Sequence, residues 1–319
     1  MNFSLCLTLA LLLDVALGDP LKLPHPVAGI GKIILLYESK LYNNDFKRGL
    51  IFCACVVFST GLIALILSLL AALISNYALY AFEIYALYAA IAWRSLKDET
   101  LPVATSLMQN DLAQARYYLS RVVGRDTENA QPAEIIRAAI ETVAENLIDG
   151  VISPLFWAAL GYLMFKDIGL IVCVWMFKAA STLDSMVGYD NERYKHFGTA
   201  SARLDDILNF VPARLGGLMI ILAGLLSGLN FVNGVKAFIR DRKKHKSPNS
   251  AHGESAFAGL LGLKLGGGAY YDKVFEARPW LGEGLEFKEP EALDILNAHK
   301  LMDASVALSA AIMLLIAEL

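Results

Sequence analysis

The residues from Gly49 to Phe82 form a run of 34 positions without a single Asp, Glu, Lys or Arg. A membrane-spanning helix needs about 20 apolar residues, so this run is too long for one span. A Ser-Asn pair at 75–76 interrupts it with residues that favour a turn. The run therefore predicts two apolar helices, roughly 50–74 and 77–93, that form a hairpin.

The composition agrees with a membrane protein. Of the 319 residues, 56% are hydrophobic and 18% are charged, whereas a soluble domain usually carries about 25% charged residues. The net charge of −3 excludes a nucleic-acid binder that relies on bulk positive charge. The four cysteines lie in apolar runs without CxxC spacing, which predicts small buried side chains rather than disulfides or a zinc site.

The N-terminal run Leu5–Leu17 resembles the apolar core of a signal peptide. It lacks a basic segment before it and an A-x-A cleavage site after it. We expect this helix to be retained in the protein.

Further apolar segments lie at 150–165, 168–177, 215–235 and 304–317, and amphipathic helices are expected at 103–123 and 132–148. The first two flank Lys166-Asp167 and fit either two short spans or one long tilted span. We predict an all-α, polytopic integral membrane protein with about five to seven apolar helices, folded as a single domain over residues 1–319. The polar segments that are expected to contribute the site are 18–49, 94–149, 181–214 and 236–300.

The basic run 236–246 predicts the orientation in the membrane. It contains six Lys or Arg against one Asp, and such a bias places a loop in the cytoplasm. A single full span at 215–235 would put the polar segments on its two sides on opposite faces of the membrane. A re-entrant helix would put them on the same face, and the sequence leaves both arrangements open.

A row of charged residues follows one face of the helix expected at 132–148. Arg137, Glu141, Glu145 and Asp149 recur every four residues, so their side chains share that face. Three carboxylates in a row repel one another unless a cation lies over them, and Mg²⁺ prefers carboxylate oxygens and often bridges to phosphates. We therefore predict Glu141, Glu145 and Asp149 as metal ligands. A solvated helix face is the alternative.

A second charged cluster lies between residues 181 and 214. Within it, Asp205 and Asn209 are expected to share a face of a helix that Pro212 ends. The cluster interleaves carboxylates with arginines, a pattern that suits a metal–phosphate site and equally suits a lattice of salt bridges beside the membrane. Its members are Asp184, Tyr189, Asp190, Glu192, Arg193, Arg203, Asp205, Asp206, Asn209 and Arg214.

Two polar loops complete the candidate features. Ser247-Pro248-Asn249 follows the basic run, and Leu265-Gly266-Gly267-Gly268 can bring backbone N–H groups close to an anion. His25 lies between two prolines and therefore in a loop. The sequence contains no phosphate-binding G-x-x-x-x-G-K-[ST] loop, and no Ser–His–Asp or Cys–His arrangement is indicated.

Several segments, in order along residues 14–282, together resemble the adenosylcobinamide-phosphate synthase family of cobalamin biosynthesis. The segments are Asp14 to Val27 with Gly18-Asp19-Pro20 and Pro24-His25-Pro26, Gly124-Arg125-Asp126, Glu141 to Asn146 with Asp149-Gly150, Ser153-Pro154-Leu155, Thr182 to Tyr189, Ala202 to Asp206, Pro212-Ala213-Arg214, Ser247-Pro248-Asn249 and Leu265-Gly266-Gly267. The chain departs from the expected family pattern at Ser181, Ala251, Gly253 and Gly268. Of these, Ser181 is the one expected to alter a ligand contact.

The resemblance implies an ATP-dependent ligase. The family joins the propionate carboxylate of adenosylcobyric acid to the amine of 1-aminopropan-2-ol phosphate or ethanolamine phosphate, in the cell (inner) membrane with the site facing the cytoplasm. ATP would be the co-substrate, Mg²⁺ its metal and the corrinoid a substrate. The preferred amino alcohol phosphate and the formation of a homo-oligomer stay open.

The resemblance and the charge clusters together assign the site residues. We expect catalytic roles for Glu141, Glu145, Asp184, Arg203, Asp205 and Asp206. We expect substrate binding by Asp19, His25, Asn146, Tyr189, Arg193, Arg214, Ser247, Asn249, Gly266 and Gly267. The two clusters are expected to converge on one pocket, because an apolar hairpin between them returns the chain to the same membrane face.

Two alternatives remain. A transporter would place ionisable residues in the middle of spans, and only Asp14 and Glu83 come near that description. A regulatory relative that has lost catalysis would be expected to lack some acidic motif residues, and all of those quoted above are present.

Overall fold

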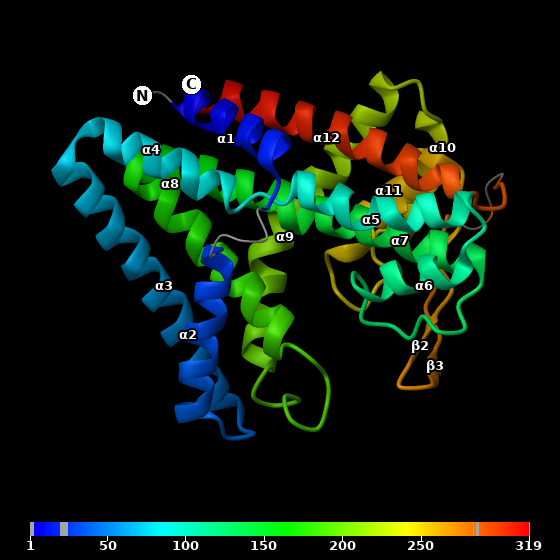
Figure 1. Cartoon of the computed structure of the whole chain (residues 1–319), viewed down its shortest axis with the longest axis horizontal. Helices are drawn as coiled ribbons and strands as arrows, with labels where there is room; N and C mark the ends of the chain where they lie inside the picture. Colours follow the sequence, from blue (N-terminus) through cyan, green and yellow to red (C-terminus); the bar gives the residue numbers. More distant parts are fainter. Residues whose placement is uncertain (1–2, 20–24, 283, 285–286, 319) are drawn as a thin grey trace. The chain divides into compact units, whose positions relative to one another are not determined.

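A computed structural model describes residues 3–19, 25–282, 284 and 287–318. They form two compact units, each described here by itself. The first comprises Met1–Ala92, Ser153–Asn209 and Ala310–Leu319, and the second comprises Trp93–Ile152 and Phe210–Ser309. Helices account for nearly all of the regular structure in the described residues (Figure 1). A single integral membrane domain over 1–319 stays a prediction.

The predicted all-α membrane fold is confirmed. Among the described residues, four helical runs are long and apolar enough to cross a membrane, namely Phe46–Ile74, Pro132–Val187, Thr199–Leu226 and Ala292–Ile316. Phe3–Leu17 is a shorter apolar helix. The run Pro132–Val187 is composed of a helix, a π-helical turn and a kinked second helix.

The first unit contains the predicted apolar hairpin. Its elements are α1 (Phe3–Leu17), α2 (Pro26–Leu41), α3 (Phe46–Ile74), α4 (Asn76–Tyr88), α8 (Ser153–Val187) and the start of α9 (Thr199–Leu226). The turn falls at Ser75, whose hydroxyl accepts a hydrogen bond from the backbone N–H of Ala78 and caps α4. Helix α3 begins earlier than predicted, and α4 ends at Tyr88 rather than near 93.

Helix α8 resolves the alternative left open for residues 150–177. Phe165 and Lys166 have non-helical backbone angles, and Lys166 has φ = 55°, so the helix is broken into two arms. The arms meet at two glycines, because a Cβ on Gly161 would lie 2.3 Å from the carbonyl oxygen of Gly169. The segment is therefore two helical arms folded against each other rather than one tilted span.

Pro212 does not end its helix, contrary to the prediction. Helix α9 runs from Thr199 to Leu226 through Pro212. A proline inside a helix leaves the carbonyl four residues before it without its usual donor. Here that carbonyl belongs to Leu208, and the indole Nε1–H of Trp157 donates to it at 3.2 Å. The replacement donor removes part of the cost that normally stops a helix at proline.

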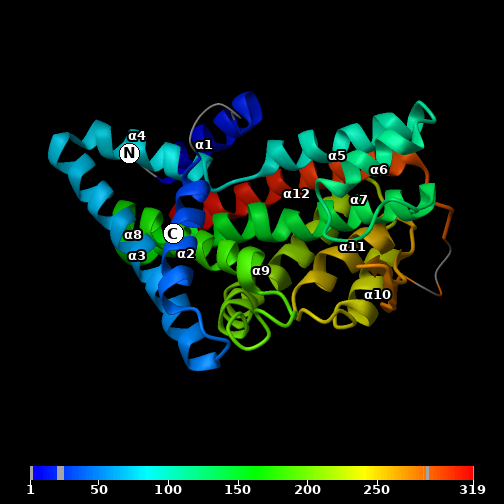
Figure 2. The ribbon, with the colours of Figure 1, turned by 60° about the horizontal axis from the view of Figure 1, so that its bottom comes forward.

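The second unit packs its helices in layers. Its elements are α5 (Trp93–Met108), α6 (Leu112–Ser120), α7 (Pro132–Leu147), the π-helical turn η1 (Ile148–Ile152), α10 (Phe231–Asp241), α11 (Ser250–Leu261) and most of α12 (Ala292–Glu318). Figure 2 shows α7 between α5 and α11, with α10 beyond α11. Helix α11 comes very close to α7, because a Cβ on Gly253 would lie 2.5 Å from the carbonyl oxygen of Ala144.

Three sequence-based helix boundaries were wrong in this unit. The helix expected over 103–123 is two helices, because Asn110 adopts φ = 59° and Asp111 caps α6. The apolar run 215–235 is divided between α9 and α10 at Gly228, which has φ = 73°. The final helix begins at Ala292 and not near 304.

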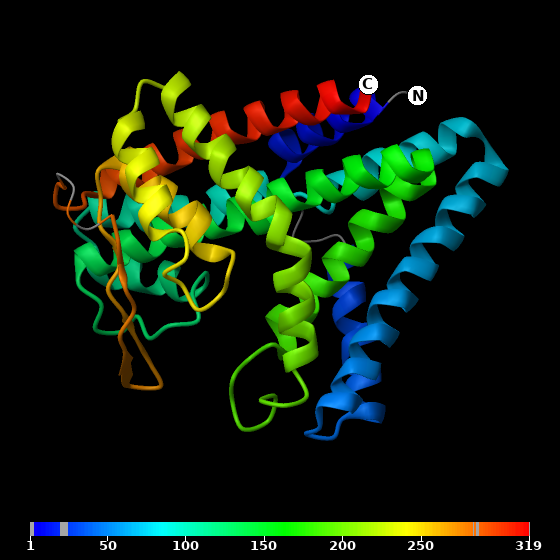
Figure 3. The ribbon, with the colours of Figure 1, turned by 180° about the vertical axis from the view of Figure 1, so that it is seen from behind.

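The glycine-rich segment after α11 forms four short strands that the sequence did not predict. Strand β1 (Leu265–Gly266) pairs antiparallel with β4 (Trp280–Leu281), and β2 (Ala269–Tyr271) pairs antiparallel with β3 (Val274–Glu276). Figure 3 shows the β2–β3 hairpin extending beyond α10 and α11. Its two turn residues, Asp272 and Lys273, both have positive φ, as a tight hairpin turn requires.

Candidate active site

The carboxylates on α7 are each held by a different element. Glu141 is buried, its Oε2 lies 2.7 Å from Nη2 of Arg125, and its Oε1 accepts a hydrogen bond of 2.7 Å from the backbone N–H of Gly266. Glu145 accepts a hydrogen bond of 2.7 Å from the hydroxyl of Ser250. Asp149 lies beyond the end of α7, in the π-helical turn η1.

These contacts bear on the predicted metal site. In the part of the chain that the structure describes, no three His, Cys, Asp or Glu side chains are placed to hold a metal ion together, and both oxygens of Glu141 already have protein partners. The trio Glu141, Glu145 and Asp149 is thus not a ready-made metal site. Mg²⁺ is often bound by one or two carboxylates together with substrate phosphates, and that mode stays a prediction here.

The predicted glycine loop approaches its neighbours at backbone distance. Gly266, Gly267 and Gly268 have φ of 85°, 84° and 110°, a region that favours glycine. A Cβ on Gly266 would lie 2.4 Å from the carbonyl oxygen of Pro279. The sequence predicted that this loop offers N–H groups to an anion, and the anion that the Gly266 N–H meets is the protein's own Glu141.

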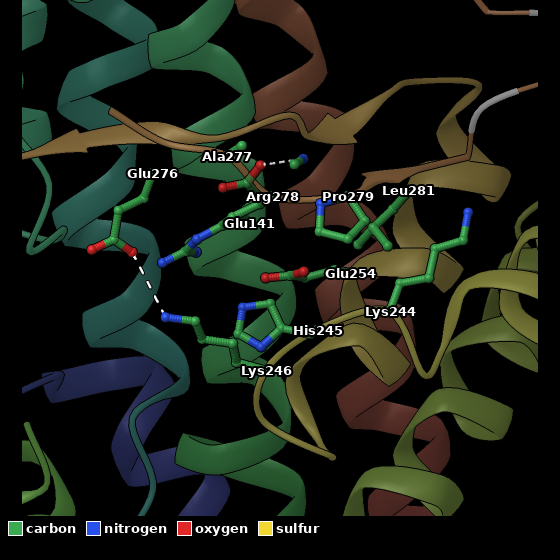
Figure 4. A pocket seen from close by; sticks show the side chains of 11 residues that line it. Glu141, Lys244, His245, Lys246, Glu254, Glu276, Ala277, Arg278, Pro279 and Leu281 are labelled. Carbon is green, nitrogen blue, oxygen red and sulfur yellow. Dashed lines mark hydrogen bonds and ion pairs between the residues drawn. The ribbon is translucent and has the colours of Figure 1, made fainter. Parts of the chain in front are cut away.

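A cavity of about 330 Å³ opens beside these residues. Figure 4 shows its lining, which comes from α7, the loop after α10, α11 and the strand segment. The lining residues are Glu141, Lys244, His245, Lys246, Glu254, Gly266, Glu276, Ala277, Arg278, Pro279 and Leu281.

Most charges in this lining are already paired. Glu141 pairs with Arg125, Lys246 lies 3.9 Å from Glu276, and Lys244 pairs with the buried Asp241 at 2.7 Å. Among the described residues, Glu254 and Arg278 have no ion-pair partner within 4.0 Å. The cavity therefore contains one carboxyl group and one guanidinium group that have no direct ion-pair partner in the described chain.

Burial changes the proton affinity of two of these groups. It raises the pKa of Glu254 well above the usual value, and the negative charges of Glu141 and Glu145 add to the effect. Burial also lowers the pKa of His245, so the ring is neutral at pH 7. Nδ1 of His245 accepts a hydrogen bond of 3.1 Å from the backbone N–H of Ser247. The ring proton therefore resides on Nε2, which can donate a hydrogen bond.

A second cavity, of about 590 Å³, adjoins the same strand. Side chains alternate along a strand, so Pro279 and Leu281 line the first cavity while Trp280 lines the second. The guanidinium of Arg137 lies 5.3 Å from the Trp280 ring centroid. The lining residues are Arg137, Lys264, Trp280, Gly284, Phe287, Lys288, Glu289 and Pro290, and cations outnumber the single carboxylate.

Three predicted binding residues come together as a clamp on the loop 247–249. Arg214 donates through Nη1 to Oδ1 of Asn249 at 2.9 Å and through Nη2 to the carbonyl of Pro248 at 3.4 Å. The hydroxyl of Ser247 accepts a hydrogen bond from the N–H of Asn249. This clamp fixes the loop that carries His245. Asn146, also predicted to bind substrate, is exposed and donates to the carbonyl of Thr142 in its own helix.

The first unit holds the predicted residues near the N-terminus and in α9. Nε2 of His25 lies 3.6 Å from Oδ1 of Asp19, and Nδ1 of His25 caps α2 through the N–H of Val27. Asp205 accepts a hydrogen bond of 3.0 Å from Asn209, which confirms that these two residues share a helix face.

The other predicted residues of this unit lie near the end of α8, in the connection to α9 and in the first turns of α9. Arg193 pairs with Glu38 at 2.8 Å and lies over the ring of Tyr42, and its role in substrate binding stays a prediction. Tyr189 is exposed, and the Arg203 guanidinium lies 6.0 Å from the ring of Phe46. The remaining predicted residues, Asp184 and Asp206, also belong to this unit. Convergence of this set with Glu141 and Glu145 stays a prediction.

The comparisons with known proteins decide the family. The sequence model of the family described as CobD/Cbib protein matches residues 7–302 of this chain. The chain belongs to the CobD/CbiB family. It is 43% identical to the cobalamin biosynthesis protein CobD of Pelobacter propionicus, covering 97% of this chain and 95% of that protein. The CobD protein of Desulfotalea psychrophila is 39% identical, with 94% of this chain and 93% of that protein covered. The CobD protein of Klebsiella pneumoniae is 37% identical, with 95% of this chain and 94% of that protein covered. No solved structure matches the chain.

Sequence reasoning missed several residues that line the first cavity of this CobD/CbiB protein. They are Lys244, His245, Lys246, Glu254, Glu276 and Arg278. For Glu254 a signal was present, because it is the only charged residue between Ala251 and Leu263. A lone carboxylate among small and apolar residues is expected to be buried, and a buried carboxylate indicates a specific structural or functional role. Arg278 carried no comparable signal, since it reaches the cavity only through the strand pairing.

Proposed function

We propose that this chain acts in cobalamin biosynthesis as an ATP-dependent ligase. It would join adenosylcobyric acid to 1-aminopropan-2-ol phosphate or ethanolamine phosphate and form adenosylcobinamide phosphate. Family membership and the names of the relatives support the pathway. The observation that carries the reaction is the first cavity, which combines carboxyl, imidazole and guanidinium groups beside the α7 carboxylates.

The chemistry has two steps. ATP transfers its γ-phosphoryl group to a propionate carboxylate, which gives an acyl phosphate and ADP. The amine then attacks the carbonyl carbon, a C–N bond forms, the C–O bond to phosphate breaks, and inorganic phosphate leaves. Before it attacks, the ammonium group must lose a proton to an acceptor such as a carboxylate. Mg²⁺ bound with the nucleotide would supply charge neutralisation during phosphoryl transfer.

The two cavities suit two different ligands of this reaction. The first has three carboxyl groups, of Glu141, Glu254 and Glu276, and three cationic groups, of Lys244, Lys246 and Arg278. The second has Arg137, Lys264 and Lys288 against Glu289, and it includes the rings of Trp280 and Phe287. Excess positive charge beside aromatic rings favours a nucleotide with its phosphates. At about 330 Å³ the first cavity is at the small end of ligand sites, which favours the small amine over the corrinoid.

We further propose that the chain resides in the cell (inner) membrane with its site facing the cytoplasm. The apolar helices support the membrane location, and the basic run 236–246 supports the orientation. Lys244 and Lys246 of this run line the first cavity, so the run and the cavity would lie on the same side of the membrane.

Turnover by the full-length chain tests the proposed reaction. Membranes that contain the protein are incubated with adenosylcobyric acid, aminopropanol phosphate and Mg-ATP, and the corrinoids are separated by mass. Adenosylcobinamide phosphate and an equal amount of ADP are expected. Membranes with the exposed-residue variant Glu128→Gln serve as the matched control and should give the same yield. A corrinoid pool that stays unchanged while the protein is folded would overturn the ligase assignment.

A further inference from the structure

Three cationic side chains of the second unit gather without a carboxylate partner. They are Arg214 on α9, Arg242 at the C-cap of α10, and Lys243 directly after it. Among the described residues, no Asp or Glu lies within 4.0 Å of any of the three. The buried Nε of Arg242 also has no hydrogen-bond partner in the described chain. Such a cluster is expected to meet an anion that the protein itself does not supply.

Helices α9 and α10 form an antiparallel hairpin. A Cβ on Gly224 of α9 would lie 2.5 Å from Cδ2 of Leu260, and a Cβ on Gly234 of α10 would lie 2.7 Å from the same methyl carbon. Farther from the turn, a Cβ on Gly217 would lie 2.4 Å from the ring of Phe238. Positions that meet are thus farther apart in sequence as the distance from the turn increases, which defines a hairpin. Figure 3 shows the two helices joined by a short turn.

The hairpin brings Arg214 and Arg242 to the same level. Arg214 lies three residues before Gly217, and Arg242 lies four residues after Phe238. Each arginine is therefore about one helical turn farther from the tip than that contact. The guanidinium of Arg242 lies 5.4 Å from the Phe238 ring centroid. The guanidinium of Arg214 donates to Oδ1 of Asn249 at 2.9 Å, so the start of α11 closes a third side of this base.

His252 adds another unmet polar group beside the cluster. Its buried ring packs edge-on against Phe238, with 5.7 Å between centroids, and neither ring nitrogen has a hydrogen-bond partner in the described chain. Burial lowers the pKa of this ring to about 4, and the positive charges of Arg214, Arg242 and Lys243 add to the effect. All three cations therefore lie close enough to act on one histidine, whose neutral ring keeps an N–H to donate.

The hairpin beyond the cluster carries no charge. The chain has no Asp, Glu, Lys or Arg from residue 215 to residue 235, as expected for a segment in contact with lipid. Leu218, Leu222 and Leu225 of α9 are exposed, and their helical spacing makes them one apolar stripe. Arg214 lies one turn before Leu218 and extends this stripe. A polar site at the arginines is therefore continuous with a surface suited to hydrocarbon chains.

We propose that the base of the α9–α10 hairpin binds the headgroup of an anionic phospholipid, with its phosphate at Arg242, Lys243 and Arg214 and an acyl chain along the leucine stripe. None of the three cations lines either cavity described above, so the site is separate from both. Arg214 already donates to the loop 247–249 through both terminal nitrogens. Arg242 and Lys243 therefore carry the direct contacts, and Arg214 contributes charge.

The geometry favours this ligand over two others that also carry phosphate. A free phosphate group would leave the leucine stripe unused. A zwitterionic phospholipid would bring its own cation to a cluster in which the described chain provides no neutralising carboxylate. An anionic phospholipid matches the cluster in charge and the stripe in polarity, and basic residues next to apolar helices attract such lipids.

Lipid binding to the full-length protein in neutral detergent tests the proposal. The probes are phosphatidylglycerol and phosphatidylcholine with the same acyl chains, and glycerol phosphate, which has the anionic group without the chains. Native mass spectrometry counts the bound molecules during each titration. Phosphatidylglycerol should bind at least about tenfold more tightly than either other probe. Equal binding of the two phospholipids would overturn the proposal. Glycerol phosphate that binds as tightly as phosphatidylglycerol would also overturn it and indicate a site for free phosphate.

Single-charge variants assign the headgroup contacts. Arg242→Gln and Lys243→Gln should each weaken phosphatidylglycerol about fivefold, the loss expected for one cation beside the headgroup. Lys243 is exposed, so its variant removes charge without disturbing a packed side chain. Lys300→Gln, at an exposed lysine of α12, is the matched control and should bind as wild type. The same affinity for phosphatidylglycerol in all three variants would contradict the assignment.

A fourth variant tests the apolar half of the site. Leu222→Ser should weaken both phospholipids to the same extent, because the stripe contacts a chain that the two lipids share. Unchanged binding of both would show that the acyl chain does not follow α9.

These measurements do not depend on turnover. Protein that prefers phosphatidylglycerol but forms no corrinoid product would leave the lipid site standing while the ligase assignment fails. Active protein without this preference would have the opposite meaning.

Discussion

The hydroxyl of Ser250 donates a hydrogen bond of 2.7 Å to Oε1 of Glu145. Ser250 begins α11, directly after the loop 247–249, and Glu145 lies near the end of α7. The bond therefore ties a carboxylate of the predicted row to one of the loops that the family resemblance singled out. It also orients the carboxylate, so that its second oxygen is the one left to meet a ligand.

Glu145→Gln tests the need for negative charge at this position. The amide can still accept the hydrogen bond of Ser250, so we expect the protein to stay folded and its Tm in detergent to change little. Turnover should be abolished, because an amide cannot replace a carboxylate beside Mg²⁺ and phosphate. Ser250→Ala, which removes about 1 kcal/mol of hydrogen bonding, should lose only about fivefold. Wild-type activity of Glu145→Gln across a series of Mg²⁺ concentrations would refute the role.

Arg203→Lys tests the catalytic role predicted for Arg203 in the first unit. Lysine keeps the charge but lacks the planar fork that matches two phosphate oxygens. We expect turnover to fall about tenfold or more, the size of one charge-assisted hydrogen bond, with no change in expression. Arg121→Lys, at a half-exposed pair with Glu99, is the matched control. Equal rates for the two variants would remove Arg203 from the site.

Lys243→Cys tests the orientation of the basic run. Lys243 is exposed, so a cysteine there is accessible to reagents on its own side of the membrane. In intact cells we expect no modification by an impermeant maleimide, and full modification after permeabilisation. Wild-type protein, whose cysteines are buried or half-buried, gives the background. Rapid labelling in intact cells would place the run, and the cavity residues Lys244 and Lys246, outside.

His252 predicts a pH dependence of stability. The ring is 1% exposed, and neither of its nitrogens has a hydrogen-bond partner in the described chain. Burial, together with the positive charge of Arg214, lowers its pKa from 6.5 to about 4. The unfolded chain takes up this proton more readily than the folded protein does. The stability is therefore complete above about pH 6.5 and falls as the pH decreases toward 4.

His252→Phe should remove this dependence. The ring of His252 already packs edge-on against Phe238, with 5.7 Å between centroids, so phenylalanine can occupy the place. We expect the Tm difference between pH 8 and pH 5 to shrink in the variant, measured by thermal unfolding in detergent. His196→Gln, at an exposed histidine, should behave as wild type. The same acid sensitivity in His252→Phe would show that other groups cause it.

Features that depend on local physics could be predicted from the sequence. The uncharged run predicted the α3–α4 hairpin because charge is costly in lipid. The four-residue spacing placed Glu141 and Glu145 on one face of α7, and Asp205 and Asn209 on one face of α9. Each of these inferences needed only the residues within one or two turns of helix.

Features that depend on distant partners could not be predicted. The first cavity exists because Gly253 touches α7 and because β1 pairs with β4, and neither contact leaves a periodic pattern. The motif Gly124-Arg125-Asp126 has no spacing that indicates its partners. In the structure Arg125 pairs with Glu141, and Asp126 accepts a hydrogen bond from the N–H of Lys273 in the β2–β3 turn. Contacts between residues that lie this far apart in the sequence depend on the whole fold.

Pro212 and Trp157 constrain the order in which substitutions can accumulate. While proline is at 212, loss of the indole leaves the Leu208 carbonyl, in a half-buried stretch of α9, without its 3.2 Å donor. A backbone acceptor that is left without a donor there is costly. If proline is replaced first, the new N–H can reach that carbonyl and the indole becomes dispensable. A lineage can therefore lose the proline and then the tryptophan, whereas the reverse order passes through a weakened intermediate. The two positions are expected to drift as a pair, with the proline the first to change.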